Sequence, residues 1–453
     1  MPALFLLLTL TLAAFAGELR VGRAAVDITP PAGMPMAGYY NIRLNEGVHD
    51  PLYAKALVLD VDGARAAPWP MVEAARKRVG ESTRIPASHV MISATHTHTG
   101  PVMSAEPRGA DEATKAIARR YHAELPAKIA EAVKLAEAGL QPARAWAAKG
   151  REASISFIRR FLMKDGSVGW NPGKLNPDIV RPLGSIDPDV PVVYFDSPAG
   201  APLLTYVNFA LHLDTVGGLR FSADYPHTLA SRLSAVMGPE MLTMFTTGAC
   251  GNINHIDVKS KAPQKGDAEA ARIGTILAGS ALKALRDLEP VEAGPLTVRR
   301  ATVELPVVEV TASEVEKANQ VAETFGTSRA PSFYEQVHAF KVLAARERNG
   351  WPFDAEVQVI TLGSEIGWVA LPGEVFVELG KAIKLASPFP YTIVIELAND
   401  KVEDYVPDLK AYSEGAYEVI STPLAAGAGE KLVETAVRLL IDARGSYPPP
   451  YRR

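Results

Sequence analysis

The sequence predicts an α/β fold in which mixed β-sheets are flanked by helices within a single large domain. Apolar extended runs alternate along the chain with segments of helical periodicity, and this alternation is typical of sheets covered by helices. The chain of 453 residues shows no internal repeat, low-complexity tract or clear linker. Length alone would allow two or three domains, but one domain is the simplest interpretation.

The first sixteen residues have the pattern of a signal peptide. An apolar stretch from Leu4 to Ala16 ends in Ala14-Phe15-Ala16, a small-x-small pattern that favours cleavage after Ala16, although no Lys or Arg precedes it. A mis-set start codon or a buried strand is the alternative. We therefore expect a secreted or periplasmic protein whose mature catalytic domain covers 17–453.

Apolar runs, alternating or continuous, predict the strands. These runs cover 19–28, 52–61, 89–94, 202–211, 241–246, 296–305, 356–362, 368–371 and 390–397. Residues 151–161 are also expected to be extended. The segment 165–191 is rich in Gly, Pro and Asn, which predicts a long loop, and loops of that length are usually functional.

Helical periodicity predicts most of the remaining elements. The expected helices cover 70–79, 111–139, 226–236, 268–288, two segments within 312–348, and 429–443, and a further helix opens at Glu374. Pro126 lies inside the second of these, so we expect a kink or two helices there.

Composition excludes several classes of protein. The net charge of -4, without a basic stripe, argues against a nucleic-acid partner. The single cysteine, Cys250, excludes an intrachain disulfide framework. No run of eighteen apolar residues follows the N-terminal segment, so we expect no transmembrane helix.

Ionisable side chains follow the predicted strands at the points where these strands end. His96 and His98 come after 89–94, and on an extended chain they project to the same side, roughly 6 to 7 Å apart. His212 and Glu374 follow two other strands, and strand ends often converge on a ligand site. Two imidazoles and a carboxylate are enough to hold a catalytic zinc ion. Solvated edge histidines are the alternative, because no zinc signature with local spacing is present.

The segment Thr95-His96-Thr97-His98-Thr99-Gly100-Pro101 resembles the Thr-His-Thr-His-Ser-Gly-Pro signature of the neutral/alkaline, non-lysosomal ceramidases, which are zinc-dependent amidases. The likeness extends over nearly the whole mature chain. Further similar segments are 22–31, 36–39, 208–212, 371–374, 398–407 and 415–418. The combination is far more specific than any one motif.

The resemblance implies four Zn²⁺ ligands: His96, His212, Glu374 and Tyr405. It also implies that His98 and Arg159 contact the scissile amide and its tetrahedral intermediate, which is coherent with a metal-polarised water or carbonyl and donors for the oxyanion. The spacing from Asn399 to Tyr405 is one residue longer than the family leads us to expect. Tyr412 and Tyr417 therefore remain alternatives for the metal-site phenol.

One departure from the family concerns the nucleophile. Where the ceramidases carry Gly-Asp-Val-Ser-Pro with a catalytic serine, this chain has Gly251-Asn252-Ile253-Asn254-His255. Asn252 and Asn254 join the candidate catalytic residues by position, but asparagine cannot act as that nucleophile. We expect direct attack by a zinc-activated water, with His98 as proton shuttle. Cys250 is more readily explained as a small buried residue than as a nucleophile.

Two other departures concern the scaffold. Between Ala64 and Pro68 the chain passes directly from a strand-like run to a helix, where a further apolar strand and an acidic residue are expected. The chain ends at Arg453, so we expect no C-terminal β-sandwich of the kind found in full-length ceramidases. Asp224 has two equally supported interpretations, as a carboxylate that fixes a ligand imidazole or as the N-cap of the next helix.

Two functions of different classes follow. The first is an exported zinc amidohydrolase that cleaves an N-acyl bond in a sphingolipid or a related amide or ester, with a substrate that could lie at a membrane surface. The second is an inactive, zinc-stabilised relative that binds a lipid or glycan at the cell surface. The altered Asn252 and Asn254 favour the second. The retained metal ligands favour the first, since a degenerate enzyme would be expected to lose them too.

Overall fold

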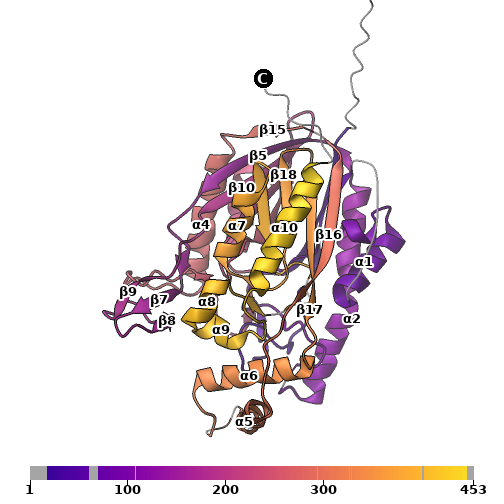
Figure 1. Ribbon diagram of the computed structural model, residues 1–453. Coiled ribbons are helices and arrows are strands. Elements are labelled where there is room, and N and C mark those ends of the chain that lie inside the picture. The colour runs from indigo at the N-terminus through magenta and orange to yellow at the C-terminus, as the bar shows by residue number, and fades with distance from the viewer. Residues whose placement is uncertain are drawn as a thin grey trace, which may run out of the picture.

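The computed structural model describes residues 18–445, apart from 61–69, Arg108, Ala293, Gly326, Ser328, 400–401 and Glu403. The predicted signal peptide and the departure at 64–68 lie outside the described residues. Within them, helices and strands alternate as predicted, and both parallel and antiparallel pairs occur, so the α/β interpretation with mixed sheets is confirmed (Figure 1).

Two mixed sheets form the centre of the molecule. One has five strands in the order β13-β11-β10-β5-β15, formed by Leu242–Thr247, Pro202–Phe209, Asp189–Asp196, Arg144–Arg151 and Glu289–Val291. The other has four in the order β16-β17-β18-β20, formed by Leu296–Leu305, Phe353–Leu362, Ile366–Ala370 and Tyr391–Ile395. Helices α3 (Tyr225–Met237) and α4 (Asp267–Ala284) pack on the first sheet, and α7 (Val377–Ala386) and α10 (Ala428–Arg444) pack on the second.

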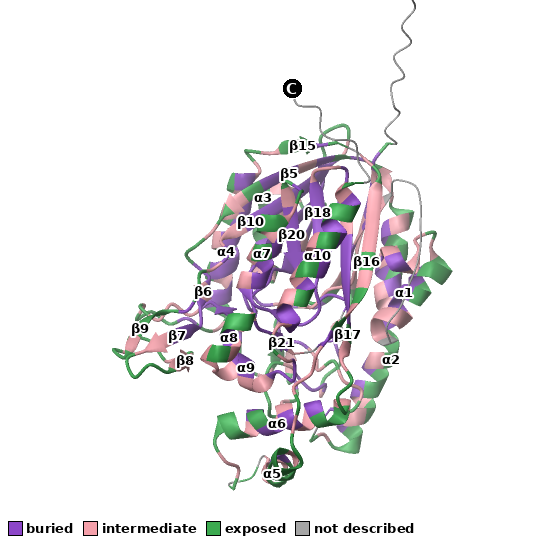
Figure 2. Ribbon diagram, in the orientation of Figure 1, coloured by how far each residue is buried: buried purple, intermediate pink, exposed green. Residues whose placement is uncertain are grey.

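The two sheets pack against each other because their strands are apolar on both faces. In β10, Val193 and Phe195 face the core between the sheets, whereas Val192 faces α3 and α4. In β20, Ile393 contributes to the same inter-sheet core and Val394 packs toward α7 and α10. The layers therefore run helix, sheet, sheet, helix, with the most deeply buried residues in the middle (Figure 2).

An N-terminal layer covers one side of this core. Strand β1 (Arg20–Asp27) pairs antiparallel with β3 (Tyr53–Asp60) and touches the short β4 (Gln141–Pro142). Helix α2 (Glu112–Ala138) packs on β1 and β3, and helix α1 (Pro70–Ser82) packs on α2. Helix α2 continues through Pro126, so the alternative of two helices is wrong. Pro126 is itself buried, and this burial offsets part of the cost of the missing backbone hydrogen bond.

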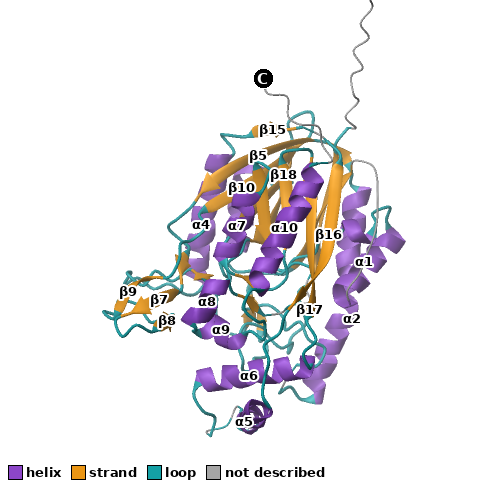
Figure 3. Cartoon of the chain, in the orientation of Figure 1, coloured by secondary structure: helices purple, strands orange, loops and turns teal. Residues whose placement is uncertain are grey.

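Smaller elements lie beyond one end of the two central sheets (Figure 3). The segment 165–191 is more ordered than the predicted loop, because β7 (Arg160–Met163), β8 (Val168–Trp170) and β9 (Ile179–Pro182) form a separate sheet. Helices α5 (Ala312–Ala322) and α6 (Phe333–Arg348) form a hairpin with its own small apolar cluster. The remaining short elements are β2 (Gly47–Val48), η1 (Ala87–His89), β6 (Phe157–Ile158), β12 (Arg220–Phe221), β14 (Ile253–Asn254), β19 (Glu374–Val375), β21 (Tyr405–Val406), α8 (Leu409–Glu414) and α9 (Tyr417–Ser421).

Two predicted elements need correction. The strand expected at 89–94 is absent, since a short 3-10 turn ends at His89 and only an isolated bridge, Ser93 to Ala398, follows. Glu374 does not open a helix but lies in β19, and α7 begins at Val377. None of the described helices combines the length and apolar character needed to span a bilayer.

Candidate metal centre

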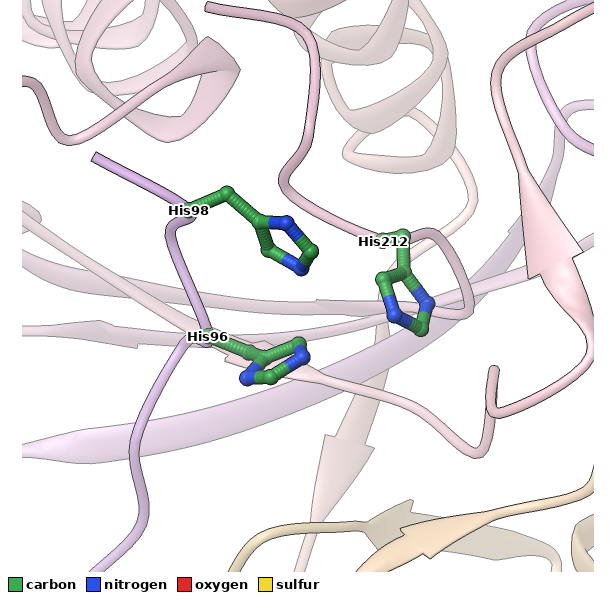
Figure 4. A group of neighbouring side chains, drawn as sticks. All are labelled: His96, His98 and His212. Carbon is green, nitrogen blue, oxygen red and sulfur yellow. The ribbon is translucent and has the colours of Figure 1, made fainter. Parts of the chain in front are cut away.

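Three imidazole rings from distant parts of the chain lie around one space (Figure 4). His96 and His98 lie in the loop after η1, and His212 follows the end of β11. The ring centroids are 4.9 Å apart for His96 and His98, 5.1 Å for His96 and His212, and 5.6 Å for His98 and His212. One nitrogen of each ring lies within 4.8 Å of the other two, so the three rings could hold a single metal ion.

Backbone contacts, rather than a regular strand, hold the first two histidines in place. His96 has a φ of 67°, in the left-handed region that non-glycine residues seldom adopt. The N–H of Ala94 donates to the carbonyl of Leu397 at 3.1 Å, and the N–H of His98 donates to the carbonyl of Leu213 at 2.9 Å. The prediction that His96 and His98 project into the same region is therefore right, but strand alternation is not the reason.

The Glu374 carboxylate completes the cluster. Its Oε2 lies 3.1 Å from Nε2 of His212 and 3.5 Å from Nε2 of His96. Burial opposes charge on Glu374, but the neighbouring imidazoles outweigh it and hold the pKa of the carboxyl well below its usual value. Burial likewise opposes charge on His96, and the Glu374 carboxylate raises the pKa of that ring. The three groups are thus coupled electrostatically.

The donor atoms of this cluster lack ordinary partners. Among the described residues, both ring nitrogens of His98, Nε2 of His212 and Oε2 of Glu374 are buried and form no hydrogen bond. Burying such groups without partners costs free energy, which a metal ion coordinated by them would offset. Nitrogen and carboxylate donors suit Zn²⁺, so the residues present fit the predicted ion.

The backbone fixes the orientation of the His212 ring. Its Nδ1–H donates to the carbonyl oxygen of Cys250 at 3.1 Å, which leaves Nε2 free to act as a donor to a metal. The Cys250 thiol itself is fully buried, and burial raises its pKa well above the usual value. These properties support the interpretation of Cys250 as a packing residue.

His98 has different neighbours from the other two rings. Its Nδ1 lies 3.6 Å from Oδ1 of Asp214, and the Tyr39 hydroxyl donates to the same carboxylate at 2.9 Å. Burial, together with the adjacent His96 ring, lowers the pKa of His98 to about 3. The ring is therefore neutral and has a carboxylate beside one nitrogen.

Arg159 lies deep in the site. Its Nε donates to Oε1 of Glu418 at 2.9 Å, and Nη2 donates to the carbonyl of Gly251 at 2.6 Å. Its Cζ lies 5.2 Å from the centre of the Tyr405 ring. Burial opposes charge on Arg159, but Tyr405 and Glu418 raise its pKa, so the guanidinium remains a fixed positive charge. Sequence reasoning gave no role to Glu418, which holds Arg159.

The structure separates the three candidate tyrosines. Tyr405 is buried and is the β-bridge partner of Glu374 in the parallel pair β19–β21. The Tyr417 ring packs edge-on against Tyr405, with centroids 5.6 Å apart. The hydroxyl of Tyr412 donates to the carbonyl of Leu424 at 2.9 Å, and its ring packs on the core under α10. The register thus favours Tyr405 over Tyr412 as a neighbour of Glu374.

The two asparagines that occupy the serine loop have internal partners. The Asn252 amide donates to Glu378 at 2.8 Å and accepts from the N–H of Val377 at 2.9 Å. The Asn254 amide donates to Asn171 at 2.7 Å and accepts from the N–H of Ile256 at 3.0 Å. Both amides therefore hold the loop that carries Gly251.

Aromatic rings extend from Tyr405 toward the surface. Tyr417 packs on Trp170 of β8, with centroids 4.2 Å apart, and lies 5.8 Å from Phe333 of α6 in a stacked arrangement. Phe333 in turn contacts Tyr40, and both are exposed by more than 40%. We call Trp170, Phe333, Tyr417 and Tyr40 the aromatic wall.

Two further carboxylates complete the description. Asp224 caps α3 and accepts hydrogen bonds from the N–H groups of Thr215, Val216 and Tyr225, so the N-cap interpretation is the one the geometry supports. Sequence reasoning did not identify Glu396 as part of the site. Burial raises the pKa of Glu396 to about 8. The sequence feature that could have identified this residue was a carboxylate inside the apolar run 390–397.

Comparison with known proteins shows which solved structures share this fold. No family model and no curated protein sequence matches the chain. Neutral ceramidase from Pseudomonas aeruginosa superposes over 96% of this chain and 76% of its own, with a TM-score of 0.69 and 21% sequence identity. A structure described as a ceramidase complexed with C2 covers 96% of this chain and 77% of its own, with a TM-score of 0.68 and 17% identity. The chain therefore has the fold of neutral ceramidase, and the sequence resemblance is confirmed at that level.

Proposed function

We propose that the chain is a zinc-dependent hydrolase that cleaves an N-acyl amide bond in a ceramide-like sphingolipid or a related amide or ester. The observation that carries the proposal is the convergence of His96, His212 and Glu374, in which Nε2 of His212 and Oε2 of Glu374 are buried without a hydrogen-bond partner among the described residues. Their occurrence in a fold shared with neutral ceramidase supports the choice of substrate class. Export to the periplasm or cell surface is part of the same proposal.

The proposed ligands are Nε2 of His96, Nε2 of His212 and Oε2 of Glu374, with the Tyr405 hydroxyl as the fourth. A second donor set would replace Glu374 by His98, since the three rings also lie within reach of one ion. The proposal takes Glu374 because its Oε2 lies close to both other rings. A zinc ion bound there would polarise a water molecule or the substrate carbonyl.

His98 is the proposed proton carrier. Both of its ring nitrogens lack a hydrogen-bond partner within the described part of the chain, so one of them could accept a proton as the amide is attacked and return it to the leaving amine. The Asp214 carboxylate, 3.6 Å from Nδ1, would stabilise the imidazolium that forms.

Arg159 supplies fixed positive charge to the carbonyl oxygen as that oxygen becomes negative. Its bonds to Glu418 and Gly251 hold it without reorganisation. Asn252 and Asn254 hold the surrounding loop in this proposal, and direct contact of either amide with substrate remains a prediction.

The aromatic wall supports an apolar acyl or sphingoid group as the part of the substrate beyond the scissile bond. The wall begins at Tyr417, in contact with Tyr405, and reaches solvent at Phe333 and Tyr40. Aromatic rings offer a large apolar contact area for such a chain.

Release of fatty acid from a fluorescent N-acylsphingosine, before and after chelation and after zinc is restored, tests the proposal. We expect chelator-sensitive turnover that zinc restores, that His96→Ala abolishes and that His122→Ala, a change on α2 outside the site, leaves intact. Zinc binding without turnover on a panel of acyl amides and esters would instead support the inactive lipid- or glycan-binding relative.

A further inference from the structure

The buried carboxylate of Glu396 lies behind the candidate metal centre and connects two of its walls. Its Oε2 accepts hydrogen bonds from the backbone N–H of Cys250 at 3.0 Å and from that of Val375 at 2.9 Å. Its Oε1 accepts from the Cys250 thiol at 2.9 Å. Glu396 is completely buried, so solvent cannot replace these bonds.

Each of the two backbone segments that Glu396 holds controls one proposed ligand. The carbonyl of Cys250 accepts the Nδ1–H of His212 and thereby sets the orientation of that ring. Val375 is the immediate neighbour of Glu374 in β19, and its carbonyl accepts from the N–H of Gly251 at 2.8 Å. One carboxylate thus bonds both to the segment that orients the His212 ring and to the segment that carries Glu374.

The backbone around Glu396 reaches the third ligand as well. The N–H of Glu396 donates to the carbonyl of Thr247 at 3.1 Å, and the hydroxyl of Thr247 donates to the carbonyl of Thr95, next to His96, at 3.0 Å. One residue further on, Leu397 accepts from the N–H of Ala94 at 3.1 Å. The segments that carry His96, His212 and Glu374 therefore all meet at this point of the chain.

We propose that Glu396 is a positioning residue for the metal centre, whose carboxylate sets the spacing of His212 and Glu374 and thereby the affinity for zinc. It touches neither substrate nor ion and acts through Cys250 and Val375. The inference rests on the zinc site of the proposed function and adds a determinant outside the ligand set. Residues that orient metal ligands typically contribute 10- to 100-fold to affinity, which is about the effect expected here.

The test is zinc affinity, measured by competition with a chromophoric chelator on purified full-length protein, together with the melting temperature of the zinc-free form. Glu396→Ala removes the acceptor for both N–H groups and is expected to weaken zinc binding by about 10- to 100-fold. Glu396→Gln keeps an oxygen in that position and is expected to restore most of the affinity. Glu396→Asp keeps the carboxyl group but is one methylene shorter, so it is expected to weaken binding and decides the question should the alanine variant fail to fold.

Asp196→Ala is the matched control. Asp196 is also a buried carboxylate with strong partners, Arg144 at 3.0 Å and Trp146 at 2.9 Å, but it lies at the end of β10 remote from the metal centre. This variant is expected to lower the melting temperature without changing zinc affinity. Equal zinc affinities for the wild type, Glu396→Ala and Glu396→Asp would overturn the inference while leaving the proposed function intact. A wild-type protein that binds no zinc would overturn both, and zinc binding without hydrolysis would overturn only the function.

Discussion

The two sides of the candidate site are built in different ways. The donor side, with His212 and Glu374, is almost fully buried and is held by backbone hydrogen bonds at the ends of the two central sheets. The aromatic wall comes from the peripheral elements β8, α6 and α9 and from the loop that carries Tyr40, and part of it is exposed. In the proposed function, the core would therefore position the metal ligands. The outer elements would determine which substrate enters.

Replacing a donor on the buried side is expected to have the largest effect. Glu374→Gln removes the negative charge between two imidazoles and should abolish zinc binding and turnover together. His98→Gln should retain zinc but lower turnover by about 10²- to 10⁴-fold, since it removes only the proton carrier. Metal analysis beside turnover separates the two, and loss of zinc from the His98 variant alone would show that the three histidines form the ligand set.

Replacing Arg159 is expected to have the next largest effect on turnover. Arg159→Lys loses the paired bonds to Glu418 and Gly251 that aim the charge, so kcat should fall by about 10²- to 10³-fold with zinc content unchanged. Arg160→Lys is the matched control, because Arg160 binds the same Glu418 but also Glu414, away from the ligands. Equal losses of kcat in both variants would mean that the effect comes from disturbing Glu418.

Changes in the aromatic wall should act on substrate choice alone. Phe333→Ala removes an exposed ring, and the lost apolar contact should raise KM for a long-chain N-acyl substrate by about 10-fold, corresponding to roughly 1.4 kcal/mol, with kcat preserved. A short acyl chain should be unaffected, and Trp351→Ala, an exposed aromatic outside the wall, serves as the control. A fall in kcat for both chain lengths would argue against separate roles for the two sides.

The smallest effects are expected for changes to two of the candidate tyrosines, Tyr405 and Tyr412. Tyr412→Phe loses one hydrogen bond to Leu424 and should cost about 1 kcal/mol of stability without changing turnover. Tyr405→Phe should lower zinc affinity or turnover by about 10-fold at similar stability. Kinetics and thermal melting of both variants check this, and the reverse order of effects would remove Tyr405 from the ligand set.

Periodicity predicted most of the fold because the central strands and helices bury continuous apolar faces. Strand β16 has the predicted bounds, and α7 and α10 cover the four-stranded sheet. Strand β10 was missed because Pro191 suggested a loop end, although Pro191 precedes the first residue paired with β11 and so costs no hydrogen bond on that side. The missing strand at 89–94 reflects long-range contacts to 397–399, which local sequence cannot show.

The candidate site likewise contains residues that the sequence predicted and residues that depend on long-range contacts. The resemblance and the ends of apolar runs were enough to name His96, His98, His212 and Glu374, because ligands need particular side-chain types. The supporting groups could not be named in this way, since the contacts of Glu396 with Cys250 and of Glu418 with Arg159 join residues more than a hundred positions apart. A carboxylate in an apolar run was the only sequence signal for Glu396.

The most direct test is crystallographic, with anomalous diffraction data collected on either side of the zinc absorption edge from protein crystallised with zinc. A single strong peak bounded by Nε2 of His96, Nε2 of His212 and Oε2 of Glu374 is the predicted result. No peak at that position at saturating zinc, or a peak elsewhere in the chain, would contradict it.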